Sequence, residues 1–174
     1  MCTPIESLDV SNIDTSNCTN LVATFYAEYE DPNTKKNTYY YINNLTGYEN
    51  WDTSNVTDFC CLFYYQSKLT SLDLSNWNLE NATDLGWMFY NCTSLSELKM
   101  PSPCSSKCTN LKSIFCGCYN LQDLSIVENW DISNVTNLAY TFADCNALTS
   151  LDLSKWNTSN VTDMRGLFSS INSM

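Results

Sequence analysis

The chain contains no histidine among its 174 residues. Histidine is the commonest general base near neutral pH and the commonest metal ligand, so its absence removes every catalytic triad that depends on imidazole. Catalysis would have to rest on carboxylates or thiols alone. The sequence therefore favours a protein that is not an enzyme and that uses no cofactor and no metal ion.

Basic residues are scarce as well. Eight lysines and arginines stand against 19 aspartates and glutamates, which gives a formal net charge of −11 and a pI near 4.1. The basic residues form no stripe, and Lys35-Lys36 is their only adjacent pair. Nucleic acids and anionic membrane surfaces attract lysine and arginine. We therefore expect neither of them as a partner.

Long apolar segments are also missing. No run of 18 apolar residues occurs, so the sequence predicts no membrane span. The first residues, Met1-Cys2-Thr3-Pro4-Ile5-Glu6, have neither a basic segment nor an apolar core and do not form an uncleaved secretion signal. A chain of this length is expected to form a single domain over residues 1–174.

What the sequence does contain is a repeated phrase. The string Asn-Trp-Asp-Thr-Ser-Asn-Val-Thr-Asp starts at Asn50, and variants of it start at Asn76, Asn129 and Lys155. An apolar residue leads each copy, and the leading residues are regularly spaced; Leu69 and Leu95, for example, are 26 apart. Self-similarity at a period of 20 to 50 residues indicates a repeat architecture. The predicted units start near residues 5, 42, 69, 95, 121 and 148.

The third unit shows the local structure that we expect. Leu72-Asp73-Leu74 alternates apolar and polar residues, which predicts a short half-buried strand. Asn81 with Asp84 three residues later is typical of a helix N-terminus. Apolar residues at helical spacing then predict a helix of about two turns; they are Ala82, Leu85, Met88 and Phe89. The predicted fold class is α/β: a leucine-rich-repeat-like solenoid of about six coils, with parallel short strands on one side and short helices on the other.

The first unit is longer than the others. Ile5 and Ile42 are 37 apart in the sequence, so roughly ten residues are inserted into the usual period. Residues 26–41 read as two aromatic arms around the turn Asp31-Pro32-Asn33, which predicts a β-hairpin. Such an insertion either forms a functional face or only covers the first unit. Because tyrosine is enriched in binding surfaces, the candidate partner-binding residues are Tyr26, Tyr29, Tyr39, Tyr40 and Tyr41.

Acidic residues recur on the predicted strands. Asp9, Asp73 and Asp152 share one outward slot. A row of carboxylates could bind Ca²⁺ or a basic partner, and the alternative is a solvated polar face. We include Asp73 and Asp152 among the candidate partner-binding residues, as groups that would steer a basic partner.

Ten cysteines are present. Cys18 occupies a slot that valine and alanine fill in other units, which indicates small apolar side chains and mostly free, buried thiols. Two alternatives are open. Neighbouring units could be joined by a disulfide between Cys118 and either Cys92 or Cys145. A zinc site could form in one unit from Cys104, Cys108, Cys116 and Cys118.

Tryptophan also recurs at one slot, at Trp51, Trp77, Trp130 and Trp156. A column of indole rings could form a ladder on which sugars stack. Packing inside a repeat array is the other interpretation, and we favour it because each ring buries a large apolar area.

The string Leu-Asp-Leu-Ser-Lys-Trp-Asn-Thr-Ser-Asn-Val-Thr-Asp-Met, residues 151–164, resembles the 26-residue repeat of bacterial surface proteins. That family occurs in Listeria, lactobacilli and Mycoplasma surface lipoproteins and is grouped with BspA-like leucine-rich repeats. The resemblance covers nearly the whole chain, although the fourth unit departs from it at Pro101-Ser102-Pro103-Cys104. It implies surface display and adhesion to host or matrix molecules, and no enzyme activity.

These observations lead to one expected function and one alternative. The expected function is a non-catalytic binding or adhesion module, at a cell surface or outside the cell, that recognises a protein or a glycan. The alternative is a structural subunit of a larger assembly, such as an appendage on a virion surface or an extracellular filament. In either case neighbouring chains could cover the open ends of the repeat array.

Overall fold

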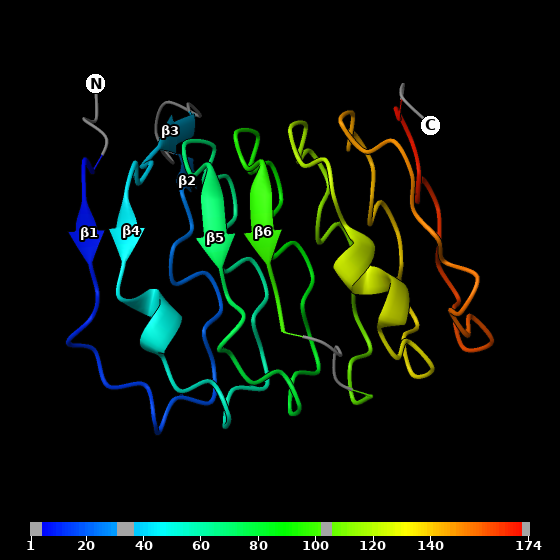
Figure 1. Cartoon of the computed structure of the whole chain (residues 1–174), viewed down its shortest axis with the longest axis horizontal. Coiled ribbons are helices and arrows are strands. Elements are labelled where there is room, and N and C mark those ends of the chain that lie inside the picture. Colours follow the sequence, from blue (N-terminus) through cyan, green and yellow to red (C-terminus); the bar gives the residue numbers. More distant parts are fainter. Residues whose placement is uncertain (1–4, 31–36, 102–105, 172–174) are drawn as a thin grey trace.

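The computed structural model describes residues 5–30, 37–101 and 106–171, and most of them form turns and irregular segments (Figure 1). The strands are few and short. They are β1 (Leu8–Asp9), β2 (Glu28–Glu30), β3 (Asn37–Tyr39), β4 (Leu45–Thr46), β5 (Ser71–Asp73) and β6 (Glu97–Lys99). Two 3₁₀ helices complete the elements, η1 (Tyr48–Asn50) and η2 (Ser125–Asn129).

The predicted fold class is wrong. No α-helix occurs in the described residues. Parallel strands there form two small sheets, β1 with β4 and β5 with β6, and the other parallel pairings are single bridges. The structure therefore does not show an α/β solenoid of about six coils with a layer of helices and a layer of strands. It shows a mostly irregular chain whose repeated segments lie side by side (Figure 1).

The segment that we predicted as a helix is bonded to the next repeat instead. The amide of Leu85 donates to the carbonyl of Asn110 at 3.1 Å, and the amide of Trp87 donates to that of Lys112 at 2.8 Å. Trp87 has a φ of 55°, in the left-handed region, which no residue of a right-handed helix adopts. Because these amides are satisfied between repeats, they are not available to a helix that was too short to be stable alone.

The predicted helix-capping pair has a different role. The Asn81 side-chain amide donates to the carbonyl of Ser54 in the preceding repeat at 2.7 Å, and the Asp84 carboxylate accepts the amide of Gly86 at 2.7 Å. Asparagine and aspartate side chains often compete with helices in this way, by hydrogen bonding to nearby backbone. The pair therefore joins two repeats and forms a local turn.

The repeats are held in one register by a column of single parallel β-bridges. The column runs through Asn20, Asp58, Asp84, Asn110, Asn137 and Asp163. Behind it lies a continuous core whose centre is a column of fully buried phenylalanines, with ring centroids 5.7–6.0 Å apart. They are Phe63, Phe89, Phe115 and Phe142.

The two 3₁₀ helices occur in the repeats whose period is longer by one position. In the repeat from Leu69, the tryptophan at Trp77 follows the leading residue by eight positions. In the repeats from Ile42 and Leu121 it follows by nine, and η1 or η2 directly precedes it. The 3₁₀ helix therefore takes up the extra residue, and it does so on the side of the molecule where the short strands lie (Figure 1).

The predicted hairpin is confirmed in its arms. β2 and β3 pair in antiparallel register, with Tyr29 opposite Thr38, inside the predicted range 26–41. The predicted turn at Asp31-Pro32-Asn33 lies outside the described residues. The amide of Tyr40 donates to the carbonyl of Ala27 at 2.7 Å, and the amide of Ala27 donates to that of Tyr64 at 2.9 Å. The pair is thereby attached to the repeat that follows it.

The last described repeat differs from those before it. Met164 is 47% exposed and Phe168 is 44% exposed, whereas Leu138 and Phe142 at the same positions of the preceding repeat are fully buried. A large apolar area at this end of the molecule is therefore open to a further contact.

Candidate recognition surface

Three tyrosines form a stacked ladder at the surface. The rings of Tyr26 and Tyr64 lie 4.6 Å apart with an interplanar angle of 6°, and those of Tyr64 and Tyr90 lie 4.8 Å apart at 14°. Each tyrosine directly follows a buried phenylalanine: Phe63 and Phe89 belong to the column, and Phe25 stacks on Phe63 with ring centroids 5.4 Å apart. The register that aligns the buried phenylalanines therefore also aligns the tyrosines outside them. We call Tyr26, Tyr64 and Tyr90 the tyrosine ladder.

Further tyrosines extend this ladder toward the hairpin. The Tyr65 ring lies 5.1 Å from that of Tyr64 and 5.3 Å from that of Tyr39. The rings of Tyr39 and Tyr41 are parallel to within 2° at 5.8 Å. Residues from the hairpin and from two later repeats thus form one aromatic surface. We call it the tyrosine patch; it consists of Tyr26, Tyr39, Tyr41, Tyr64, Tyr65 and Tyr90.

A hollow of about 340 Å³ lies beside the ladder and is lined by Tyr26, Cys61, Tyr64 and Trp87. The Lys112 ammonium lies 4.7 Å from the centre of the Trp87 ring, a cation–π contact at the edge of this region. Burial raises the pKa of the Tyr64 phenol above its ordinary value of about 10, so the hydroxyl stays protonated at neutral pH. The surface can therefore offer apolar ring edges together with hydroxyl donors.

The patch contains three of the five predicted tyrosines, Tyr26, Tyr39 and Tyr41. Tyr40 is 43% exposed, and Tyr29 lies in the middle of β2. Sequence reasoning missed Tyr64, Tyr65, Tyr90 and Trp87. A usable signal was present, because Phe63-Tyr64 and Phe89-Tyr90 are the same dipeptide at the same place in successive repeats, and Phe25-Tyr26 repeats it.

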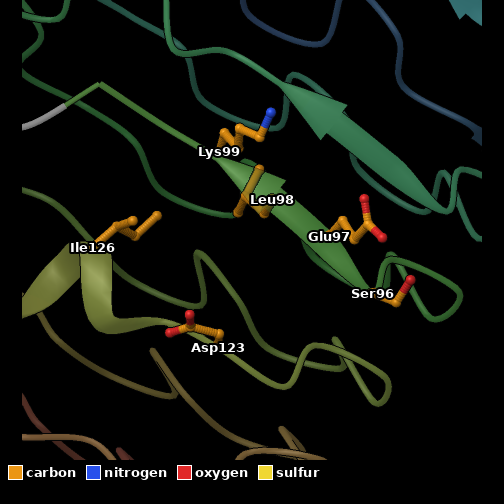
Figure 2. A pocket seen from close by; sticks show the side chains of 6 residues that line it. All are labelled: Ser96, Glu97, Leu98, Lys99, Asp123 and Ile126. Carbon is orange, nitrogen blue, oxygen red and sulfur yellow. The ribbon is translucent and has the colours of Figure 1, made fainter.

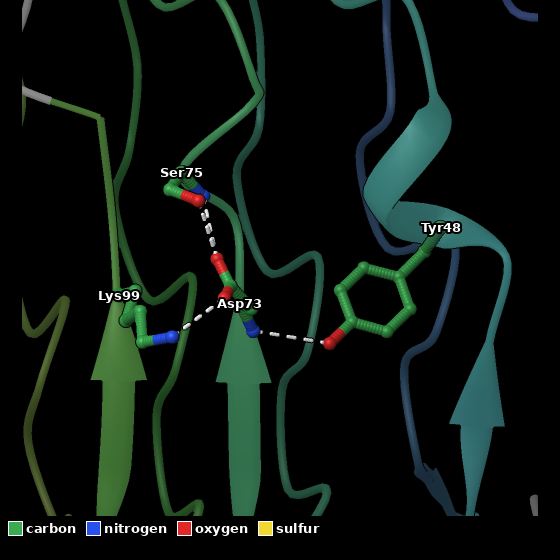
Figure 3. A network of polar contacts seen from close by, with 4 residues as sticks. All are labelled: Tyr48, Asp73, Ser75 and Lys99. Atoms are coloured by element: carbon green, nitrogen blue, oxygen red, sulfur yellow. Dashed lines mark hydrogen bonds and ion pairs between the residues drawn. The ribbon is translucent and has the colours of Figure 1, made fainter.

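Asp73, a predicted steering group, is held in a network of polar contacts (Figure 3). Its carboxylate accepts the Ser75 hydroxyl at 2.6 Å and pairs with the Lys99 ammonium at 2.9 Å. Its backbone amide donates to the Tyr48 hydroxyl at 3.1 Å. The Ser75 hydroxyl bond, followed by the Lys99 bond, lowers the pKa of Asp73 to about 2. The negative charge of Asp73 is therefore balanced locally by Lys99.

Asp152 lies in a different repeat and shares none of these contacts. Its carboxylate accepts the amide of Ser154 at 2.9 Å, and its amide donates to the Glu128 carboxylate at 3.2 Å. The bonds from Ser154 lower the pKa of the Asp152 carboxyl. The structure thus does not bring Asp73 and Asp152 together in one site, and their steering of a basic partner stays a prediction.

The described cysteines are free, as predicted, but only four of these eight are buried, Cys92, Cys108, Cys118 and Cys145, whereas we expected most of them to be buried. The other four are partly exposed: Cys18, Cys60, Cys61 and Cys116. The thiols of Cys92, Cys118 and Cys145 each lie 3.1–3.2 Å from a backbone carbonyl of the preceding repeat, to which they donate. Burial raises the pKa of the Cys145 thiol to about 12. These thiols act as buried donors, and neither alternative disulfide is formed.

The tryptophan column packs in the core, as we favoured. Trp51, Trp77 and Trp130 are at most 5% exposed, and Trp156 is half-buried. The indole N–H of Trp77 donates to the carbonyl of Tyr48 at 2.9 Å. Rings that are buried in this way offer no face to a sugar.

Within residues 5–30, 37–101 and 106–171, one group of potential metal ligands lies together: Asp58, Cys60 and Asp84. Asp58 accepts the Cys60 amide at 3.0 Å, and Asp84 accepts both the Gly86 amide and the Asn110 side chain. These turns and the contact to the next repeat account for the carboxylates without an ion. Of the alternative zinc ligands, Cys108, Cys116 and Cys118 belong to no such group, and Cys104 lies outside the described residues.

The fold and this surface define a repeat protein with an exposed aromatic patch. The family model described as "Mycoplasma protein of unknown function, DUF285" matches residues 2–100 and again residues 98–174. The chain therefore belongs to the DUF285 family, and the double match agrees with the internal repeats. No curated protein and no solved structure matches the chain. In the part of the chain that the structure describes, no helix has the length and apolar character to cross a membrane.

Proposed function

We propose that this protein is a non-catalytic binding module, displayed on a cell surface or outside the cell, that recognises a partner protein through the tyrosine patch. The observation that carries the proposal is the stacked ladder of Tyr26, Tyr64 and Tyr90 at the surface. The resemblance of the repeats to BspA-like surface proteins supports display outside the cell. The absence of histidine supports a function without catalysis.

The geometry of the ladder favours a protein over a glycan. Sugars stack on the exposed face of an aromatic ring, but both faces of Tyr64 are covered, by Tyr26 at 4.6 Å and by Tyr90 at 4.8 Å. What the ladder presents is a row of ring edges and hydroxyl groups. Rigid, amphipathic tyrosine surfaces of this kind are enriched where proteins bind proteins.

The patch is also ordered before any partner arrives. The amide of Tyr65 donates to the carbonyl of Tyr90 at 2.7 Å, and the amide of Ala27 donates to that of Tyr64 at 2.9 Å. Ring stacking and these backbone bonds fix the side chains in advance. Binding then loses less conformational entropy than it would on a flexible loop, which favours affinity.

The test compares three variants on arrays of purified extracellular proteins and of glycans, followed by affinity measurement on a protein that binds. Tyr26→Ser, Tyr64→Ser and Tyr90→Ser combined should weaken binding at least about tenfold, because aromatic anchors dominate interface energies. The same three positions changed to phenylalanine keep the stacking and should lose less. Tyr140→Ser, at a residue that is 39% exposed outside the patch, is the matched control and should bind normally.

Three outcomes would count against the proposal. Binding to glycans alone would show that the partner class is wrong. Unchanged protein binding by the folded serine variant would place the contact surface elsewhere. A chain that binds nothing on the arrays but sediments as concentration-dependent assemblies would favour the alternative, a structural subunit, whose contacts would include the exposed Met164 and Phe168.

A further inference from the structure

The edge of β6 that faces away from β5 carries the backbone groups of Leu98. β6 pairs with β5 on one side, where the Glu97 amide donates to the carbonyl of Thr70 at 3.2 Å and the Lys99 carbonyl accepts the amide of Leu74 at 2.8 Å. Backbone groups of successive strand residues point to opposite edges. The N–H and C=O of Leu98 therefore point away from β5, toward the repeat that starts near residue 121.

That edge is unpaired. No hydrogen bond in the described part of the chain joins the backbone of β6 to residues 121–126, because η2 (Ser125–Asn129) stands where a strand would pair. Two other junctions between neighbouring repeats also lack a pair of strands, and there a side chain accepts a backbone amide across the junction. The Tyr48 hydroxyl accepts the amide of Asp73, and the Glu128 carboxylate accepts the amide of Asp152.

A pocket of about 290 Å³ lies along this edge (Figure 2). Leu98 from β6 and Ile126 from η2 supply apolar atoms, while Glu97 and Asp123 supply two carboxylates. The bonds from Ser125 lower the pKa of Asp123, so its carboxylate is charged at neutral pH. The cation of the lining, Lys99, is paired with Asp73 on the β5 side. The complete lining is Ser96, Glu97, Leu98, Lys99, Asp123 and Ile126.

We propose that this pocket binds an arginine side chain carried by an extended segment of a partner protein. The guanidinium fork matches carboxylates in charge and hydrogen-bond geometry, and it can also donate to the free Leu98 carbonyl. The aliphatic part of the arginine would pack against Leu98 and Ile126. An extended segment could continue along the open edge of β6, as peptides that add a strand to a sheet do. The site is separate from the tyrosine patch and does not depend on it.

The test is an NMR titration of the ¹⁵N-labelled full chain with N-acetyl-Gly-Arg-Gly-amide. The neutral isostere N-acetyl-Gly-citrulline-Gly-amide is the matched ligand control, because it keeps the shape and removes the charge. We expect saturable shifts of the Leu98 and Asp123 amides with the arginine peptide and at least fivefold weaker binding of the citrulline peptide. Glu97→Gln combined with Asp123→Asn should weaken arginine binding at least tenfold. Asp9→Asn is the protein control, since Asp9 is another exposed acid followed by serine at the second position, and it should change nothing.

Two results would overturn the proposal. If both peptides bind equally, or their shifts map away from β6 and residues 123–126, the pocket is not an arginine site. If Asp9→Asn weakens binding as much as the double variant, the attraction is only that of the net charge of −11. Should the double variant fail to fold, the comparison of the two peptides on the unchanged chain decides the question by itself.

Discussion

At the scale of single residues, the recurring aspartates shape the chain locally. Asp9 accepts the amide of Ser11 at 2.9 Å, and the same two-residue turn recurs in other repeats. Further examples are Asp14–Ser16, Asp52–Ser54, Asp123–Ser125 and Asp131–Ser133. The serine bonds lower the pKa of each of these carboxyl groups. The recurring aspartates therefore act mainly as local turn formers, each holding the backbone two residues further on.

The contribution of the Asp73 carboxylate to the stability of the fold can be measured through its dependence on pH. Its pKa is lowered to about 2 in the folded chain, against about 3.9 when unfolded. A lowered pKa means that the carboxylate stabilises the fold above the unfolded value, and this stability is lost as the pH falls toward 2. Asp73→Asn should therefore lower the Tm at pH 7, and the difference from the unchanged chain should shrink between about pH 5 and about pH 2. Thermal unfolding across this range checks it; a difference that does not vary with pH would contradict it.

Residue-scale predictions succeeded where one slot could be compared across repeats. The described cysteines are free, as predicted, although Cys18 is only partly buried while Val56 and Ala82 at the same position of other repeats are fully buried. A tryptophan recurs before the Asn/Asp turn of successive repeats, and Trp51, Trp77 and Trp130 are buried. The thiol–carbonyl bond from Cys92 to Phe63 could not be foreseen, because it depends on how closely neighbouring repeats approach.

At the scale of elements, the tight turns between bridges replace the predicted helices. Trp87 and Asn91 both have left-handed φ values, 55° and 54°, and they are four residues apart. A chain that turns in this way every four residues also brings apolar side chains such as Leu85 and Phe89 to one side. The apolar spacing of a short helix and of such turns is therefore the same, and periodicity alone could not separate them.

Gly117 tests the turn geometry. It occupies the same column as Asn91 and has a φ of +76°, and a Cβ built on it would meet the Asn91 side chain. Gly117→Ala should destabilise the fold by about 1–2 kcal/mol from backbone strain, with more from the close contact. Asp144→Gly is the matched control, because Asp144 lies in this column at a φ of 60°. It should change the free energy of unfolding by less than about 1 kcal/mol. Denaturant unfolding gives both values, and a neutral Gly117→Ala would argue against the turn.

The hairpin and the strands show where element-scale prediction holds. The arms around residues 26–41 carry local turn and strand signals, and β2 and β3 pair as predicted. The parallel strands were over-predicted, because the extra residue of the longer repeats forms η1 or η2 and interrupts pairing there. A single added residue is visible in the sequence, but its effect on a neighbouring repeat is a tertiary property.

At the scale of the whole molecule, bonding between repeats produces the surfaces. Tyr64 and Tyr90 are one repeat period apart, so one register stacks both of them and the phenylalanines behind them. This part of the candidate site was predictable from the period. Tyr26 was predicted as a hairpin residue, but the period does not predict its stacking on Tyr64, since the hairpin insertion separates the two by more than one period; only the repeated Phe25-Tyr26 dipeptide indicates it. The pocket beside β6 could not be predicted from the sequence either, because it exists where the next repeat forms η2 and no strand pairs with β6.

In the described chain, backbone amides find their partners across the junctions between repeats and not within helices. Hydrogen–deuterium exchange read amide by amide tests this arrangement most directly. The amides of Leu85, Trp87 and Phe89 donate to the next repeat. They should exchange roughly two orders of magnitude more slowly than the equivalent amides of the last repeat. Those are Met164, Gly166 and Phe168, for which the described residues provide no partner.

The pattern along the chain decides the outcome. We expect the slowest exchange at Leu85, Trp87, Phe89 and Asn91, whose amides donate across the junction at 2.8–3.1 Å. The Met88 and Tyr90 amides should exchange faster than these, because they donate only to the carbonyls of Leu85 and Trp87, three residues back, at 3.3 and 3.1 Å. The Gly86 amide, bonded only to the Asp84 side chain, should also exchange faster. Unbroken protection through residues 85–91, as in a helix, or exchange at Leu85 as fast as at Met164, would contradict the account.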